Sequence, residues 1–170
     1  MNDVFVEQII EKRQDLKSTL KKLGIVFAAL LISSVFLVIG ILRFIFPAVF
    51  ALCMYGAFRF VKDQNIEFEY SFTNGELDID RIIGRRKRKS ELSVRVRKFE
   101  IMAPMVEKYR KEYETQNIVR IVDASSSPVS GSRWFARFND DSGLTTLLIF
   151  EPNERLINAI SKYIPGKLKQ

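Results

Sequence analysis

The chain has 170 residues, 27 Lys and Arg against 20 Asp and Glu, and a formal net charge of +7. It contains no His and a single cysteine, Cys53. These counts exclude His-based catalytic triads, the usual His-containing zinc sites and any intramolecular disulfide. There is also no glycine-rich phosphate-binding loop. Composition therefore predicts a protein that is not an enzyme, with no catalytic residues, no metal site and no cofactor.

The first predicted element is a juxtamembrane amphipathic helix over residues 1–22. Ile9, Leu16 and Leu23 recur at a spacing of seven residues, which places them on one helical face. The charged residues between them suit a helix that lies along the inner leaflet of a membrane. The pattern leaves two alternatives open, a short coiled coil and a solvated extension of the first membrane helix.

Two apolar segments follow, and we interpret residues 23–61 as a transmembrane hairpin. Residues 24–42 contain neither charge nor proline, and at about 1.5 Å per residue they approach the roughly 30 Å hydrocarbon core of a bilayer. The second span covers about 45–61, with Pro47 in its first turn, where a missing N–H is tolerated. Two adjacent apolar runs favour this interpretation over a cleaved signal peptide or a buried hairpin of a soluble protein.

The charges beside these segments predict the orientation of the hairpin. Five cations precede the first span and two follow the second, whereas Arg43 lies between the spans. The positive-inside rule then places both termini in the cytoplasm, as in a multi-pass protein of the cytoplasmic membrane. The flanking cations are Lys12, Arg13, Lys17, Lys21, Lys22, Arg59 and Lys62.

From residue 66 the hydrophobic period changes to two, which is typical of strands. Strands are expected over 66–72 and 77–83, joined by Asn74-Gly75, the strongest short signal for a β-hairpin. Four carboxylates share the solvent face of this hairpin and need nearby cations. They are Glu67, Glu69, Asp78 and Asp80.

The remaining elements are short. Alternating apolar residues predict strands over 92–96, 118–123, 134–139 and 144–150, and a change of phase at Phe99 predicts a bulge near Lys98. A small helix is expected after Pro104. A last amphipathic helix begins at Pro152, ends before Pro165 and suits the covering of an open sheet end.

The basic run Arg85, Arg86, Lys87, Arg88 and Lys89 is the candidate lipid-binding site. Anionic headgroups attract such residues by about 1 kcal/mol per cation close to the membrane surface. Alternatively, a third strand carries the run beside the acidic hairpin face and neutralises its carboxylates within the fold. The run lacks interleaved aromatic residues, so no nucleic-acid partner is expected.

Two polar segments are further candidate sites. The loop that contains Ser125, Ser126 and Ser127 suits an ordinary turn better than an anion site, and without His it offers no base for a serine hydrolase. Asp140 and Asp141 suit a turn better than a metal pair, because further ligands are lacking nearby.

Several segments together resemble bacterial membrane proteins that carry a pleckstrin-homology-like (PH-like) domain. The resemblance is carried by YSFTNGELDI, by the basic stretch that leads to SVRVRKFEIMAP, and by SGSRWFARFNDDSG followed by LLIFEPNERLINAISKYIP. More narrowly, the chain resembles a small bacterial membrane-protein family classified as a domain of unknown function. The resemblance implies an α+β fold, in which the transmembrane hairpin precedes an antiparallel β-sandwich or partly open barrel over 62–170, capped by the C-terminal helix. It implies no activity or cofactor.

The expected function is a non-catalytic, membrane-anchored module. Its expected partners are the lipid bilayer, anionic lipid headgroups, and a membrane-protein partner or a second copy. The alternative is an accessory subunit of a membrane transporter or enzyme complex that assembles through the hairpin. In that case Ala29 and Ser33, with Gly40 and Gly56, allow a close approach of helices.

Overall fold

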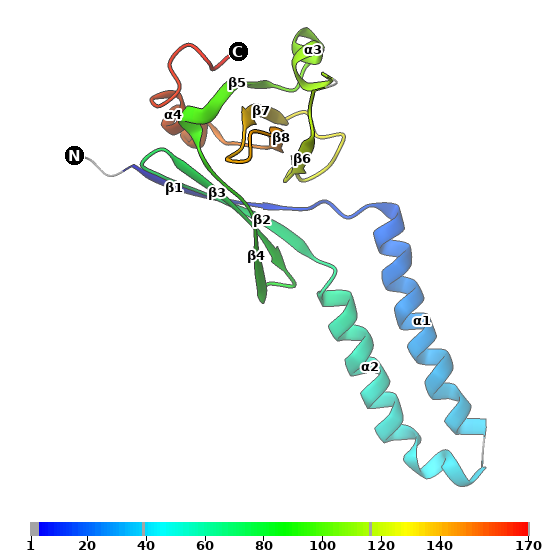
Figure 1. Cartoon of the computed structure of the whole chain (residues 1–170). Helices are drawn as coiled ribbons and strands as arrows, with labels where there is room; N and C mark the ends of the chain where they lie inside the picture. Colours follow the sequence, from blue (N-terminus) through cyan, green and yellow to red (C-terminus); the bar gives the residue numbers. More distant parts are fainter. Residues whose placement is uncertain (1–3, 39, 116, 170) are drawn as a thin grey trace. The chain divides into compact units, whose positions relative to one another are not determined.

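The computed structural model describes residues 4–38, 40–115 and 117–169, which form two compact units (Figure 1). The sheet unit comprises Met1–Lys12, Glu67–Ile82 and Arg86–Gln170. The helical unit comprises Arg13–Ile66 and Ile83–Arg85. The helical unit is therefore inserted into the sheet unit, whereas the sequence analysis placed the complete domain after the hairpin, in residues 62–170.

The N-terminal segment is a strand, so the amphipathic helix predicted over residues 1–22 is wrong. Strand β1 (Phe5–Glu11) pairs antiparallel with β2 (Ile66–Thr73), and its side chains alternate between exposed and half-buried. Helix α1 begins only at Leu16. Apolar residues occur on both faces of β1, which hides the period of two, and pairing with β2 decides the conformation.

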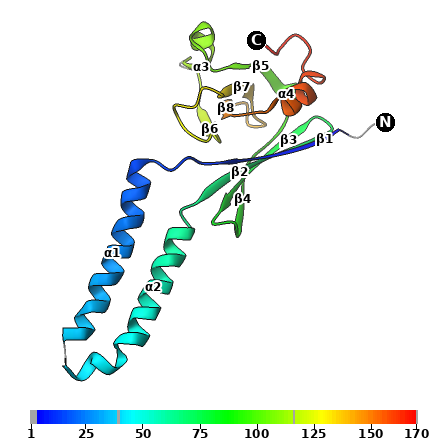
Figure 2. The ribbon, with the colours of Figure 1, turned by 180° about the vertical axis from the view of Figure 1, so that it is seen from behind.

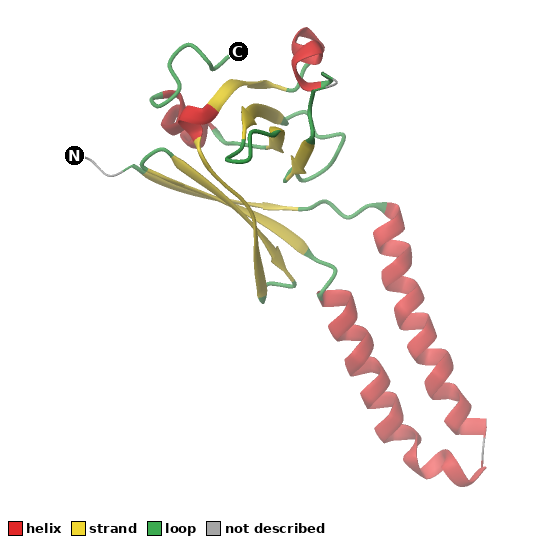
Figure 3. Ribbon diagram, in the orientation of Figure 1, coloured by secondary structure: helices red, strands yellow, loops and turns green. Residues whose placement is uncertain are grey.

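Four strands form the first sheet, in the order β1-β2-β3-β4. The predicted hairpin between β2 and β3 (Glu76–Ile83) is confirmed, because Asn74 and Gly75 form its turn with φ angles of 48° and 96°. Strand β4 (Lys87–Arg95) follows β3 as the third strand that the sequence left as an alternative. Figure 3 shows these strands in yellow.

The second sheet has the order β5-β7-β8-β6, and neither sheet closes into a barrel. Strand β6 runs parallel to β8, while β7 pairs antiparallel with both β5 and β8. The predicted bulge takes the form of a 3-10 turn over Val96–Lys98 and a register shift between Phe99 and Ile101. The strands are β5 (Phe99–Pro104), β6 (Arg120–Asp123), β7 (Trp134–Asn139) and β8 (Thr145–Phe150).

Short helices pack against the two sheets, α3 (Arg110–Tyr113) against β7 and α4 (Glu154–Ser161) against β1. A 3-10 turn (Glu107–Tyr109) and α3 follow β5, and Tyr113 packs edge-on against Phe135 with ring centroids 5.3 Å apart. Helix α4 begins at Asn153, whose side chain accepts a hydrogen bond from the N–H of Leu156. The predicted C-terminal helix is thus confirmed in a shorter form.

Tyr70 links the two sheets from inside the core. Its side chain is fully buried, its hydroxyl donates to the carbonyl of Ala124 (2.7 Å), and it accepts from the N–H of Glu151 (3.2 Å). Burial raises the pKa of the Tyr70 phenol well above its ordinary value. Tyr70 therefore stays neutral, and its hydroxyl keeps the proton that it donates to the carbonyl of Ala124.

The helical unit contains the two predicted apolar helices. Helix α1 (Leu16–Val38) is joined by a 3-10 segment (Gly40–Ile45) to α2 (Phe46–Lys62), which has Pro47 in its first turn as expected. Seen from behind, α1 and α2 run side by side (Figure 2). Both helical segments are long and apolar enough to cross a membrane. The buried side chains of α1 and α2 are small, namely Ala29, Ser33 and Ala57.

Candidate functional site

The basic run begins in the turn between β3 and β4. Gly84, Arg85 and Arg86 form this turn, which we call the basic turn. Gly84 and Arg85 each have a φ of 58°. Glycine adopts this left-handed conformation freely, whereas a residue with a Cβ pays about 1–3 kcal/mol for it. Strained residues of this kind cluster at functional sites. Arg85 is therefore the residue of the run that the backbone singles out.

Within the helical unit, the turn is attached to the end of α2. The N–H of Gly84 donates to the backbone oxygen of Asn65 (2.8 Å). A Cβ at position 84 would lie only 2.8 Å from Oδ1 of Asp63, so this close approach requires glycine. Gly84 and Arg85 of this turn, with Ile83 at the end of β3, belong to the same compact unit as the two helices.

Asn65 also connects this turn to α1. Its Oδ1 accepts hydrogen bonds from Nε2 of Gln14 (3.0 Å) and from Nζ of Lys22 (2.8 Å). Asn65 therefore bonds to groups before and within α1, and through its main chain to the basic turn. The sequence analysis did not identify this contact, because the three groups come together only when the helices pair.

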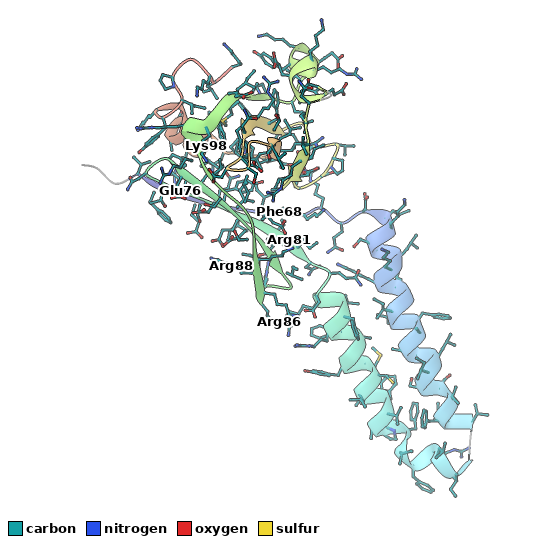
Figure 4. The ribbon with its side chains drawn as sticks, in the orientation of Figure 1. Phe68, Glu76, Arg81, Arg86, Arg88 and Lys98 are labelled. Carbon is teal, nitrogen blue, oxygen red and sulfur yellow. The ribbon has the colours of Figure 1, made fainter. Side chains whose placement is uncertain are left out.

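One residue of the basic run pairs with the acidic face of the β2–β3 hairpin. Nη2 of Arg88 lies 2.6 Å from Oε2 of Glu69, and Nη1 of Arg88 lies 3.7 Å from Oδ2 of Asp80. Arg88 thus neutralises the acidic face of the sheet, as the alternative interpretation expected. Figure 4 labels Arg86 and Arg88 at the start of β4.

All five residues of the run lie at the surface. Arg85, Arg86, Lys87 and Lys89 are exposed, and the Arg88 side chain is itself 58% exposed. Arg85 belongs to the helical unit, and Lys87 is only two residues further along the chain, within about 7 Å of backbone. Chain length therefore keeps Arg86 and Lys87 close to Arg85.

The serine loop uses its donors within the protein. The N–H and hydroxyl of Ser125 donate to Oδ1 of Asp123 (2.9 and 2.6 Å), and those of Ser126 donate to Oε1 of Glu151 (both 2.9 Å). Because carboxylates already occupy these donors, the loop does not offer them to an external anion. The turn interpretation of this loop is confirmed.

Asp140 and Asp141 have separate structural roles. Oδ1 of Asp140 accepts from the N–H groups of Ser142 and Leu144 (both 2.9 Å), as in a turn. Asp141 pairs with Lys98, whose ammonium group holds the pKa of the Asp141 carboxyl below its ordinary value. Across residues 4–38, 40–115 and 117–169, no three His, Cys, Asp or Glu side chains gather as metal ligands.

A hollow of about 520 Å³ lies at the other end of the first sheet. Arg95 and Arg97 line it together with the Asn74-Gly75 turn and two carboxylates, Glu76 and Asp78. Opposite charges are thus mixed on its wall. Since β4 runs from Lys87 to Arg95, roughly 20 Å of strand separates Arg95 from Lys89, the last residue of the basic run.

Comparison with family models identifies the fold. The chain matches a bacterial PH-like domain (DUF6106) over residues 2–170. The chain belongs to this family. The match covers β1, both helices and both sheets of this DUF6106 protein, so the inserted helical unit lies within the family's own boundaries. Searches of curated proteins and of solved structures found no match.

Proposed function

We propose that this DUF6106 protein is a non-catalytic module, anchored in the cytoplasmic membrane by α1 and α2, whose basic turn contacts anionic lipid headgroups. The observation that carries the proposal is the hydrogen bond from Gly84 to Asn65, which attaches the turn to the end of a helix long enough to cross a membrane. Cations close to an anionic surface gain about 1 kcal/mol each.

The exposed side chains of the helices support the membrane anchor. Leu31 in α1 and Phe58 in α2 are 54% and 65% exposed, which is costly in water but favourable in lipid. The hydroxyls of Ser33 and Ser34 donate to the carbonyls of Leu30 and Leu31 (3.0 and 2.8 Å), so the polar groups of this stretch are satisfied inside the helix.

Charge is distributed unequally between the two ends of the helical unit. Arg43 lies in the connection between the helices, whereas Lys22, Arg59, Lys62 and Arg85 accompany the opposite ends. Under the positive-inside rule, this distribution supports a multi-pass orientation with both chain termini in the cytoplasm. The basic turn then faces the inner leaflet, which carries the anionic lipids.

The proposal is tested on the full-length protein in phosphatidylcholine vesicles. EPR measures the association of spin-labelled phosphatidylglycerol relative to spin-labelled phosphatidylcholine. Arg86→Gln with Lys87→Gln should lower this selectivity, by up to about fivefold per cation if each contributes about 1 kcal/mol. Arg95→Gln with Arg97→Gln removes the same charge from the far end of β4 and should leave the selectivity unchanged. Equal effects of the two pairs would refute a localised lipid site.

Arg85→Gly separates lipid contact from folding. Glycine adopts a φ of 58° without strain, so this substitution should keep stability within about 1 kcal/mol. Phosphatidylglycerol selectivity should nevertheless fall. The fluorescence of Trp134, which is the single Trp of the chain and lies in the sheet unit, reports whether the fold is intact.

The accessory-subunit alternative has weaker support. Ala29 and Ser33, the small residues expected to face a partner helix, are buried within the unit in which α1 packs against α2. Their small size already serves this packing. A partner would therefore have to use other residues of the hairpin.

A further inference from the structure

Strand β1 combines a free edge with exposed apolar side chains. It is the terminal strand of its sheet, and in the described part of the chain no strand pairs with its other side. Phe5 and Ile9 are 63% and 52% exposed although both are large and apolar. Long apolar edges are normally shortened, bulged or covered, because they attract further strands.

The free backbone groups of β1 belong to the same residues that expose their side chains. The N–H of Asn74 donates to the carbonyl of Val4 (3.1 Å). Alternate residues of an antiparallel ladder bond to the same neighbour, so Val6 and Ile10 bond to β2. Phe5, Glu7 and Ile9 consequently direct their N–H and C=O groups to the open edge.

The exposed face of β1 is acidic as well as apolar. We define the β1 strip as Phe5, Glu7, Ile9 and Glu11, whose side chains alternate between apolar and carboxylate along the exposed face. On the neighbouring strand, Glu69 lies opposite Ile9 and Glu67 lies opposite Glu11. A strand added to this edge would place its outward side chains beside the strip and within reach of Glu7.

We infer that the β1 strip is a docking edge for an extended segment of a partner protein in which apolar and basic side chains alternate on one face. Backbone hydrogen bonds to Phe5, Glu7 and Ile9 would supply affinity, as in other cases of strand addition. Lys or Arg beside Glu7 would supply specificity, since a like charge placed there is repelled. This site is separate from the basic turn, and its partner is a protein rather than lipid.

A second copy of this chain fits the edge poorly. Two β1 strands related by a two-fold axis would pair antiparallel and place the same strip side by side. The second copy would bring further carboxylates and no basic side chain on this face, and like charges placed beside one another are repelled. Charge therefore favours a different protein as partner.

The inference is tested on the full-length protein in dodecyl maltoside micelles. The probe is a fluorescein-labelled eight-residue peptide with Ile and Lys alternating at every second position and Thr between them. Fluorescence anisotropy should show saturable binding, at least tenfold tighter than that of the same peptide with Glu in place of Lys. Absence of binding, or equal binding of the two peptides, would overturn the inference.

Variants of Glu7 separate charge from edge pairing. Glu7→Gln should weaken binding of the Lys peptide severalfold, whereas Glu154→Gln, which neutralises an exposed carboxylate on α4, should not. Glu7→Pro removes an N–H that lies outside the β1–β2 ladder, so the fold should persist while binding is lost. Unchanged binding to Glu7→Pro would contradict strand addition.

Methylated probes keep the test decisive even if the proline variant fails to fold. N-methylation of the alternate peptide amides that face β1 should abolish binding to the unmodified protein, whereas methylation of the other set should not. Arg86→Gln with Lys87→Gln should leave peptide binding unchanged, which distinguishes failure of the lipid proposal from failure of this one. Sedimentation that shows a β1-dependent dimer would instead identify a second copy as the occupant.

Discussion

In the helical unit, Leu31 and Phe58 leave more than half of their surface exposed, whereas Phe72 and Leu77 in the sheet unit are completely buried. The two units therefore place the same kinds of side chain in opposite environments. The sheet unit follows the rule for water, with apolar groups inside. The helical unit buries small residues and exposes large ones, as expected where lipid surrounds a helix pair.

The comparison also shows how one chain can join two such regions. The helical unit replaces the short connection that would otherwise join the antiparallel neighbours β1 and β2. Insertions between neighbouring strands disturb a sheet little when the strand ends stay together. Each unit can then satisfy its own surroundings, which leads to predictions that test their independence.

The largest expected effect comes from removing the inserted unit. The ladder ends with Glu11 opposite Glu67, and extending it by one pair in the shortened chain would set Lys12 opposite Ile66, so a two-residue Asn-Gly turn can replace residues 13–65. The shortened protein should remain folded and monomeric in water without detergent. Size-exclusion chromatography and Trp134 fluorescence measure the outcome.

A matched truncation sharpens this test. A chain that begins at Ile66 also lacks the helices but loses β1, which leaves the edge of β2 and the inner face of the sheet uncovered. We expect this fragment to aggregate. If the version with the Asn-Gly turn aggregates equally, the sheet unit depends on the helices and the two units are not independent.

Sequence alone predicted the elements that local signals determine. The Asn74-Gly75 turn needs positive φ angles at both positions, and Pro47 can occupy the first turn of a helix without losing a hydrogen bond. These features depend on residues close together in the chain. The same holds for α4, where Asn153 caps the helix.

The features that were missed depend on distant partners. Strand β1 exists because β2, which begins at Ile66, pairs with it, and the apolar residues on both faces of β1 obscured the alternation. The pairing of Arg88 with Glu69 likewise depends on distant residues, because β4 must lie beside β3. Gly84 could have indicated the turn before β4, since glycine is a common turn residue.

The second prediction compares two phenylalanines. Phe72→Ala removes a fully buried ring that packs against Tyr163 at 5.5 Å between centroids. It should lower the free energy of unfolding of the sheet unit by about 3–5 kcal/mol. Phe58→Ala in α2 should leave that free energy unchanged. Urea unfolding of the full-length protein in detergent, followed by Trp134 fluorescence, measures both variants, and similar losses would show that the units unfold together.

The smallest effect concerns Gln8, which joins β1 to the rest of the sheet unit. Its Nε2 donates to the carbonyl of Glu151 and its Oε1 accepts from the N–H of Asn153, both at 2.8 Å. Gln8→Met keeps the size of the side chain but leaves both backbone groups without this partner. The free energy of unfolding should fall by about 1–3 kcal/mol.

Glu7→Gln is the control for this substitution. Glu7 precedes Gln8 in the same strand, but its side chain lies on the opposite, exposed face. It should change the free energy of unfolding by less than about 0.5 kcal/mol. A loss confined to Gln8→Met would mean that β1 contributes to the stability of the sheet unit through its inner face, which leaves its outer face available for binding. Equal losses would mean that the outer face is structural too, and the docking edge inferred for β1 would then lose its basis.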